Sequence, residues 1–505
     1  MAKAAAALSK AAAAGKRTPR QRMPSQRKKQ AVVVIHGMGE QRPMDTLRSF
    51  VETVWAKDRT VSKEQPATTD NRYWSKPYDR TGSLELRRLT TPGDKNGIRT
   101  DFYEFYWADI MQGTLTQHLW SWVSGLLLRS VRQVPFDVLH VWVLLWIIAL
   151  VIAAMSLVVA FPDANAAPWT WSYFVDLKTY FPMKQFLAWD RGVLSGVTVL
   201  LGIVTHRFLV PYFGDVARYV RADPANIQKR KEVMERGLAL LRGLHYSEDG
   251  KPSEYDRIIV VGHSLGTNVA YDLITHLWAE YYQHFKITKT NKLGKNVGAI
   301  EKFFNHADKD NPFPEPFNVK GFRKAQHDLY GALRDQPERP WLISDFVTIG
   351  SPLTHAEFLI TRTKKQLSLK QQLREIPTCP PTPERPGNKW TITYHPSGEK
   401  HRLMHHACLF APVRWTNVYC RNALAHLFVL PGDIISGPVA RHFKPGVIDK
   451  RVWIWHWTLG FAHTAYWTWK SDFQVDNPPN HIKILRDALN LRDKGDPFMK
   501  WVKED

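Results

Sequence analysis

The chain has 505 residues, of which 44% are apolar, and these values are typical of a globular protein with a large core. Its three cysteines are too few for a disulfide framework. Because none of them lies in a C-x-x-C motif, we expect a reducing compartment and no structural zinc. The net charge of +22 favours an acidic partner or an anionic membrane surface.

Residues 1–30 are rich in alanine and then in lysine and arginine, and the first acidic residue of the chain is Glu40. Because the segment lacks the apolar stretch of a secretory signal, we expect a disordered, solvated tail. Two alternatives stay open. One is a tail that rests on anionic lipid or nucleic acid, and the other is an organelle transit peptide, which is also basic and poor in acids.

Three segments follow the tail before the first long apolar stretch. Residues 31–37 are mostly β-branched and predict a buried strand that runs into the loop His-Gly-Met-Gly at 36–39. Residues 57–100 are polar and contain several prolines and glycines, so we interpret them as surface loop. Residues 101–107 alternate in polarity and are aromatic, which predicts another strand of the same sheet.

Residues 138–161 carry no formal charge and are long enough to span a hydrocarbon core, which takes about 20 residues. Residues 192–213 form a second such segment, interrupted by His206 and Arg207. Aromatic residues gather in the loop between the two segments, as they do at membrane interfaces. We therefore expect a transmembrane helical hairpin over residues 138–213. The alternative is a buried helical cap over a soluble site.

The charges around this hairpin predict its orientation. Arg129 and Arg132 precede the first segment, Arg218 and Arg221 follow the second, and the connecting loop carries charges of both signs. Both outer flanks should therefore face the cytoplasm. Strands on either side of the insertion must share one sheet, so the chain must cross the membrane an even number of times. We expect a multi-pass protein of the bacterial inner membrane, with its soluble domain and termini in the cytoplasm.

A strand, a tight turn and a helix follow one another in the middle of the chain. Residues 227–244 predict an amphipathic helix, and the four apolar residues 258–261 then predict a buried strand. Gly262-His263-Ser264-Leu265-Gly266 comes next, and an apolar helical pattern begins at Val269. In this context a G-x-S-x-G turn strains the serine backbone and lifts its hydroxyl above the sheet edge. The alternative interpretation is a glycine turn with a solvated serine.

The second half of the chain predicts the remaining strands. We expect them at residues 342–349, 413–419 and 451–457, with one or two helices in the lysine-rich excursion 283–338. A Pro-Gly-Asp sequence that ends at Asp433 follows the second of these strands.

A serine hydroxyl is a weak nucleophile near neutral pH and needs a base. Histidine can take its proton and return it to the leaving group, and a carboxylate can orient the imidazole. After a G-x-S-x-G turn, the acid follows a late strand and the histidine follows the last one. Ser264, Asp433 and His463 fit these positions, and this chemistry needs no cofactor and no metal. The alternatives are Asp449 or Asp345 as the acid, His442 or His456 as the base, and Ser351 as the nucleophile.

The oxyanion formed during such a reaction needs hydrogen-bond donors. The Leu265 N–H lies at the start of the predicted helix, and the backbone of Met38 in the His36-Gly37 loop is the second expected donor. For His36 itself we expect that it orders this loop and has no catalytic role.

These motifs resemble the α/β-hydrolase superfamily, and more narrowly bacterial, largely uncharacterised membrane-associated hydrolases of lipase or esterase type. The resemblance implies a mostly parallel central sheet flanked by helices, interrupted by the hairpin, with the triad and oxyanion roles given above. One departure is that residues 420–431 separate the late strand from Asp433 by more than the usual short loop. The resemblance covers the soluble pieces and lies in residues 36–43, 255–271, 348–356, 415–419 and 463–467.

We therefore expect a tail at 1–30, two pieces of one hydrolase domain at 31–137 and 214–505, and the transmembrane hairpin at 138–213. The expected function is a membrane-anchored serine hydrolase that cleaves esters, including lipid or acyl esters, through an acyl-enzyme. Its partners would be the bilayer and the ester substrate. The alternatives are an acyltransferase on the same fold and an inactive hydrolase-fold scaffold. Nucleic-acid binding ranks last, because no pattern of stacking aromatic residues or recognition helix accompanies the basic charge.

Overall fold

The structure is a computed structural model, and it leaves residues 1–27 of the predicted tail, Met38, His456 and most of the predicted hairpin outside the residues it describes. Lys29 and Gln30, which the sequence assigned to the tail, belong to the first strand. The segment from residue 108 to residue 218, which contains the predicted hairpin, is called the insertion below; single positions between 128 and 150 of it are described, as is Tyr219 directly after it. The continuous described ranges are 28–37, 42–61, 70–78, 85–111, 224–246, 253–304, 312–361, 363–420, 435–454, 462–468, 477–493 and 495–500, together with Asp433.

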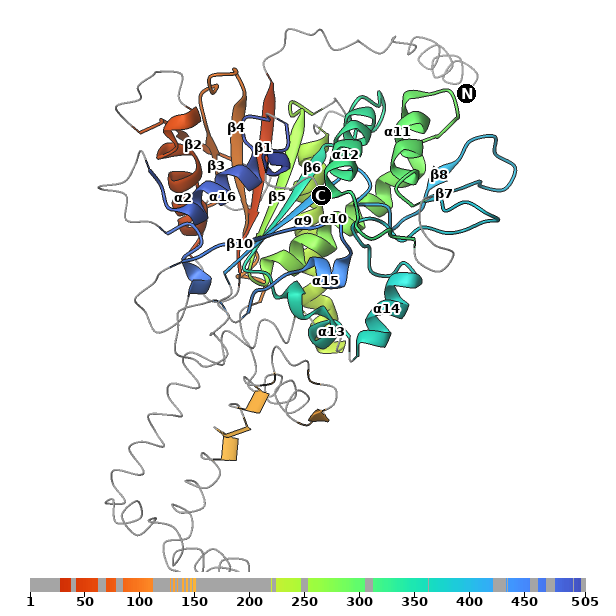
Figure 1. The fold of residues 1–505 in the computed structure, drawn as a ribbon. Coiled ribbons are helices and arrows are strands. Elements are labelled where there is room, and N and C mark those ends of the chain that lie inside the picture. The colour runs from red at the N-terminus through yellow and green to blue at the C-terminus, as the bar shows by residue number, and fades with distance from the viewer. Residues whose placement is uncertain are drawn as a thin grey trace, which may run out of the picture.

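An eight-stranded sheet forms the centre of the molecule, with strand order β10-β9-β6-β5-β1-β4-β3-β2 (Figure 1). The six strands from β10 to β4 pair in parallel, and β3 and β2 add an antiparallel edge. The expected mostly parallel α/β sheet flanked by helices is therefore confirmed. Its strands are β1 (Lys29–Ile35), β2 (Trp74–Pro77), β3 (Arg87–Thr90), β4 (Arg99–Phe105), β5 (Arg257–His263), β6 (Ile343–Ile349), β9 (Arg414–Tyr419) and β10 (Ile448–Arg451).

The central strands are buried on both faces, which explains their continuous apolar sequences. Successive side chains point to opposite faces, so Val33 and Val260 join one core cluster while Val34 and Val261 join the other. Helices α9 (Pro224–His245), α10 (Gly266–Tyr281) and α12 (Val319–Arg334) belong to the first cluster, and α2 (Asp45–Val51) and α16 (Asn480–Leu489) to the second. The sheet is thus covered on both sides (Figure 1).

Shorter elements complete the described fold. A two-stranded sheet of β7 (Thr393–Tyr394) and β8 (Leu403–Met404) lies outside the main sheet. The remaining helical elements are η1 (Glu52–Ala56), η2 (Arg59–Val61), η7 (Tyr282–His284), α11 (Lys292–Glu301), η8 (Pro352–His355), α13 (Ala356–Leu359), α14 (Lys364–Gln372), α15 (Ala440–Phe443), η10 (Ala462–Thr464) and η11 (Pro497–Lys500).

Two expectations about the strands were wrong. Residues 57–100 contain β2 and β3 and are more than surface loop. Their polarity arises because β2 is an edge strand with every residue exposed. The last strand that the structure describes is β10 at Ile448–Arg451. Residues 452–454 of the strand predicted at 451–457 are not in a strand, since the partner β9 ends at Tyr419, opposite Arg451. Residues 455–457 lie outside the described residues. The strands predicted at 31–37, 101–107, 258–261, 342–349 and 413–419, and the helix at 227–244, are confirmed within a few residues.

The strand order reverses next to β1, whose neighbours are β4 on one side and β5 on the other. Chain segments leaving two adjacent parallel strands in opposite directions open a crevice at their carboxyl ends, where ligands of open α/β sheets bind. The His36-Gly37 loop follows β1 and Ser264 follows β5, so both lie at this reversal point.

The described residues contain no helix that is long and apolar enough to cross a membrane. The segments predicted to span, 138–161 and 192–213, lie almost entirely outside these residues. The two ends of the insertion do come together. Trp107, just before it, lies 6.3 Å from the ring of Tyr219 near its end, and the Tyr219 hydroxyl donates to Asp272 at 2.8 Å.

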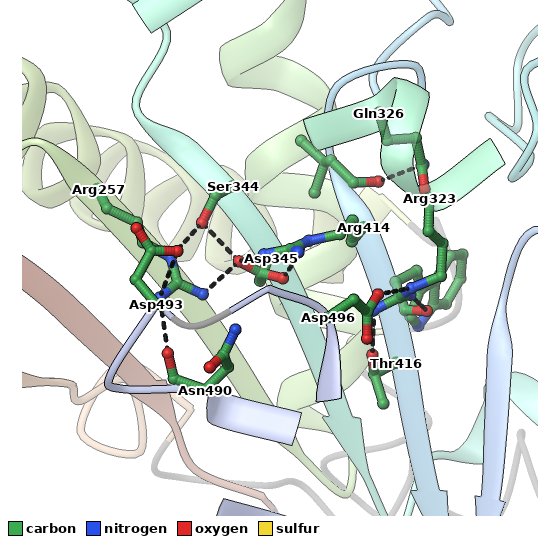
Figure 2. A network of polar contacts seen from close by, with 12 residues as sticks. Arg257, Arg323, Gln326, Ser344, Asp345, Arg414, Thr416, Asn490, Asp493 and Asp496 are labelled. Carbon is green, nitrogen blue, oxygen red and sulfur yellow. Dashed lines mark hydrogen bonds and ion pairs between the residues drawn. The ribbon is translucent and has the colours of Figure 1, made fainter. Parts of the chain in front are cut away.

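A buried network of charges ties the C-terminal segment to the amino ends of the strands (Figure 2). Asp345 on β6 accepts from Arg257 on β5 at 2.6 Å and from Arg414 on β9 at 2.9 Å, and the two guanidinium groups lower the pKa of its carboxyl despite burial. Arg257 also binds the Asn490 carbonyl after α16, and Arg323 on α12 pairs with Asp496. The network anchors the chain at Asn490 and Asp496. Asp345 lies toward the amino ends of the strands, whereas Ser264 lies at their carboxyl ends.

Candidate active site

Ser264 lies in a tight turn between β5 and α10, with a φ of 54° in the left-handed region. A non-glycine residue held there costs about 1–3 kcal/mol and persists only where its surroundings enforce it. Here the Ser264 N–H donates to the Ile349 carbonyl at the end of β6, and its own carbonyl accepts from the N–H and hydroxyl of Thr267. The turn is thus held by contacts on both sides of the serine.

The glycines on either side of Ser264 are required by close packing. A Cβ at Gly262 would lie 2.6 Å from the Cα of Thr267, and one at Gly266 would overlap the carbonyl oxygens of Ile35 and His36. Gly37 is equally constrained, because its Cβ would lie 2.6 Å from the Cβ of Ser264. Gly37, two residues after β1, is therefore packed directly against the serine side chain.

Asp433 and His463 lie in contact: the His463 Nδ1 is 2.9 Å from the Asp433 Oδ2, and both side chains are buried. The Nδ1 must carry the hydrogen, since an ionised carboxylate only accepts. The opposite nitrogen, His463 Nε2, is buried and has no hydrogen-bond partner among the described residues. An imidazole oriented by a carboxylate at Nδ1 and unoccupied at Nε2 is the arrangement a general base needs.

Asp433 returns to the end of β9 although a long excursion separates them in sequence. Its N–H donates to the Cys420 carbonyl at 2.7 Å, and the Cys420 N–H donates to the Tyr466 hydroxyl at 2.9 Å. The residues at the two ends of this excursion, Cys420 and Asp433, are therefore bonded to each other, and Asp433 lies next to the end of β9 as it would after a short loop. Gly350, at the end of β6 with a φ of 59°, packs against the pair and leaves no room for a side chain.

Tyr466 is a member of this cluster for which sequence reasoning assigned no role. Its hydroxyl donates to the Asp433 Oδ2 at 2.7 Å and lies 2.9 Å from the Ser436 hydroxyl. Burial and the neighbouring carboxylate raise the pKa of Tyr466 well above its usual value, so the hydroxyl stays protonated. The sequence feature that could have identified Tyr466 is its position three residues after His463. At this spacing both side chains lie on the same side of the turn and reach the same carboxylate.

The carboxylate of Asp433 remains ionised despite its burial. Burial alone would raise its pKa, but the adjacent His463 and hydrogen bonds from His463, Tyr466 and Ser436 outweigh this effect and lower the pKa to about 2. The second oxygen, Oδ1, accepts the Ile435 N–H at 2.9 Å. At neutral pH the group is therefore an anion with a fixed orientation, which can stabilise a positive charge on His463.

His36, at the end of β1, makes its contacts with Gly37 and Trp107. Its Nδ1 donates to the Gly37 carbonyl at 2.8 Å, its Nε2 accepts the Trp107 N–H at 3.3 Å, and its ring stacks on that tryptophan. Burial lowers the pKa of His36 to about 4, which keeps the ring neutral in this arrangement. Both ring nitrogens are used within the loop and its neighbour, so neither is directed at a reacting group.

Of the two expected oxyanion donors, the structure describes only Leu265. Leu265 is the residue before α10, and among the described residues no acceptor takes its N–H. It lies next to the serine at the start of a helix, where backbone N–H groups bind anions. Met38 lies outside the described residues, so its role remains a prediction.

His263 connects the serine turn with the base. Its Nε2 lies 2.8 Å from the His463 carbonyl oxygen, and the centroids of the two imidazole rings are 5.1 Å apart. Because His263 directly precedes Ser264, this contact brings the segment carrying His463 beside the serine. The structure thus places Ser264, His463 and Asp433 at the carboxyl ends of β5, β6 and β9, and no hydrogen bond joins the Ser264 hydroxyl to His463 Nε2.

The alternative residues have other roles where the structure describes them. Asp449 accepts the N–H groups of Val439 and Ala440 at 2.9 Å each and so caps α15. Asp345 pairs with Ile259 in the sheet, five residues before Ser264, which corresponds to roughly 16 Å along a strand. Ser351 caps η8 and bonds Thr267, and His442 lies in α15.

Comparison of the chain with protein-family models, with curated proteins and with solved structures gave no match.

Proposed function

We propose that the protein is a serine hydrolase that cleaves carboxylic esters through an acyl-enzyme. The observation that carries the proposal is the strained Ser264 turn held beside a buried Asp433–His463 pair. A glycine turn with a solvated serine would need neither the positive φ nor an oriented histidine beside it. The α/β-hydrolase resemblance supports the same conclusion, because the nucleophile, acid and base occur in its chain order after the same strands.

In the proposed reaction His463 takes the hydroxyl proton of Ser264 as the oxygen attacks the ester carbonyl. The carbonyl oxygen becomes an anion, which accepts hydrogen bonds from the Leu265 N–H and, as we expect, from the Met38 N–H. His463 then returns the proton to the leaving alcohol, and the acyl-enzyme forms. Water adds to the acyl group in the same way, releases the acid and restores Ser264. Asp433 stabilises the imidazolium in both steps.

The test is reaction with a fluorophosphonate probe, which phosphonylates an activated serine and mimics the attacked ester. We expect one stoichiometric adduct, mapped by peptide mass spectrometry to the segment that contains Ser264. Heat-denatured protein should give none, because the activation depends on the folded contacts of His463 and Asp433. Absence of an adduct on the folded protein, or an adduct on Ser351, would contradict the proposal.

We further propose that the insertion anchors this hydrolase to a membrane, with the site facing the cytoplasm. The uncharged segment 138–161 supports this proposal, as does the meeting of the insertion's ends at Trp107 and Tyr219, since a hairpin must leave and re-enter at one place. Trp107 also stacks on His36, so the insertion is rooted beside the site. A site close to the bilayer favours lipid or acyl-ester substrates, which partition there.

Cysteine labelling can test the membrane topology. Asn165→Cys in the loop between the predicted spans should react with an impermeant maleimide only from the outer side, and Ser247→Cys only after the inner side is exposed. The native cysteines provide a low background, because Cys379, Cys408 and Cys420 are buried and burial raises the pKa of each thiol. Equal labelling of both variants from the cytoplasmic side would instead indicate a soluble cap.

A further inference from the structure

His463 lies in a short helical element that packs against the second core cluster. The element, η10, has three residues, and residues 462–468 around it make contacts with several other parts of the fold. Within that range Tyr466 bonds Asp433, and the Trp467 carbonyl accepts from Thr53 at 2.7 Å. The backbone of the base itself is attached through its carbonyl, which accepts from His263.

His263 lies on a central strand of the sheet. It is the last residue of β5, a strand buried along its whole length and paired on both sides. Its ring also packs edge-on against Trp467 at 4.7 Å, so its orientation is defined by two contacts with the same segment. The side chain of His263, which precedes Ser264 in the sequence, therefore contacts the backbone of His463.

The hydrogen-bond direction follows from the partner. A backbone carbonyl can only accept, so the hydrogen is on Nε2 of His263. Burial, together with the nearby His463, lowers the pKa of His263 to about 3, and the ring is neutral at working pH. A neutral donor holds His463 without repelling the positive charge that His463 acquires when it takes the serine proton.

We propose that His263 is a positioning residue, which fixes the backbone of His463 beside the Ser264 turn by donating its Nε2 hydrogen to the His463 carbonyl. The proposal rests on the proposed hydrolase function. Its consequence is that the residue between Gly262 and Ser264 contributes to turnover through the base and without touching substrate. A misplacement of about 1 Å in such an arrangement can cost roughly 100-fold in rate.

The test compares donors of different reach at position 263. His263→Gln places an amide N–H near the position of the imidazole Nε2, whereas His263→Asn carries the same amide one methylene shorter and cannot reach the His463 carbonyl. We expect His263→Asn to lower kcat about 10- to 100-fold with KM within about twofold, and His263→Gln to recover most of that loss. The phosphonylation rate of Ser264 should follow the same order, because it reports base-assisted attack.

His405→Leu is the matched control. His405 is buried, its Nε2 lies 3.1 Å from the Thr382 carbonyl, and burial lowers the pKa of its ring to about 3, but it follows β8 outside the main sheet. We expect this variant to lose thermal stability and keep the kcat of the folded protein.

Equal kcat values for folded His263→Gln and His263→Asn would overturn the positioning role, as would a wild-type kcat in His263→Asn. Because the shorter amide of His263→Asn leaves buried polar groups without partners, this variant is also expected to be less stable, and kcat is therefore compared per folded protein after thermal melts of both variants. A wild-type protein that neither hydrolyses esters nor reacts with fluorophosphonate would instead contradict the hydrolase function itself.

Discussion

Ser264→Ala is expected to abolish ester hydrolysis and fluorophosphonate labelling while the protein stays folded. The acyl-enzyme cannot form without the hydroxyl, and loss of the serine in such a triad costs on the order of 10⁶-fold in kcat. Alanine keeps the Cβ that the turn already accommodates at a φ of 54°, so the backbone strain is unchanged. Turnover of a short soluble ester and the thermal midpoint, measured on the same preparation, separate the chemical effect from unfolding.

Ser351→Ala is the control for this experiment. Ser351 is buried like Ser264, but its hydroxyl caps η8 and bonds Thr267. Removing a cap of this kind costs about 0.5–2 kcal/mol, so we expect a lower thermal midpoint and continued labelling. Labelling that persists in Ser264→Ala and disappears in Ser351→Ala would move the nucleophile to Ser351.

His463→Ala should lower kcat by about 10⁴- to 10⁶-fold, because Ser264 then loses the group that removes its proton. Asp433→Asn should also cost heavily, at most about 10⁴-fold, since the amide reverses the hydrogen bond at His463 Nδ1 and favours the wrong tautomer. Steady-state kinetics on a short ester, with circular dichroism to establish folding, measure both effects.

Asp449→Asn distinguishes this assignment from its main alternative. Asp449 binds the first N–H groups of α15 and the Asn417 side chain and does not contact His463. We expect Asp449→Asn to lower stability and to retain kcat. If Asp449→Asn lost turnover and Asp433→Asn retained it, Asp433 would not be the acid.

The local elements could be predicted from the sequence because their signals are local. Residues 258–261 are consecutive apolar residues, which only a buried strand or helix accommodates, and the glycines at 262 and 266 mark a turn that no other residue fits. Strand β2 gave no such signal. At an exposed edge of the sheet the pairing is made by the backbone, and the side chains are free to be polar.

The contact between Asp433 and His463 could not be predicted from local sequence patterns alone. Chain order suggested both residues, but the long segment after Cys420 made the acid uncertain, since sequence spacing says little about distance once a loop closes on itself. One backbone hydrogen bond, from the Asp433 N–H to the Cys420 carbonyl, brings Asp433 back to β9, and the Tyr466 hydroxyl bonds both the Cys420 N–H and the Asp433 carboxylate. Loop closure costs little more for a long segment than for a short one, which is why the excursion can be accommodated.

By itself, the sequence determined the parallel strands, the turn that strains Ser264 and the order of nucleophile, acid and base, because each follows from residue type and short-range spacing. Only the tertiary structure decided which acid faces His463, that Asp345 belongs to a charge network at the opposite edge, and that His263 holds the His463 carbonyl. These depend on contacts between residues 30 to 200 positions apart. Such contacts are made by packing of whole elements, and no periodicity along the chain encodes them.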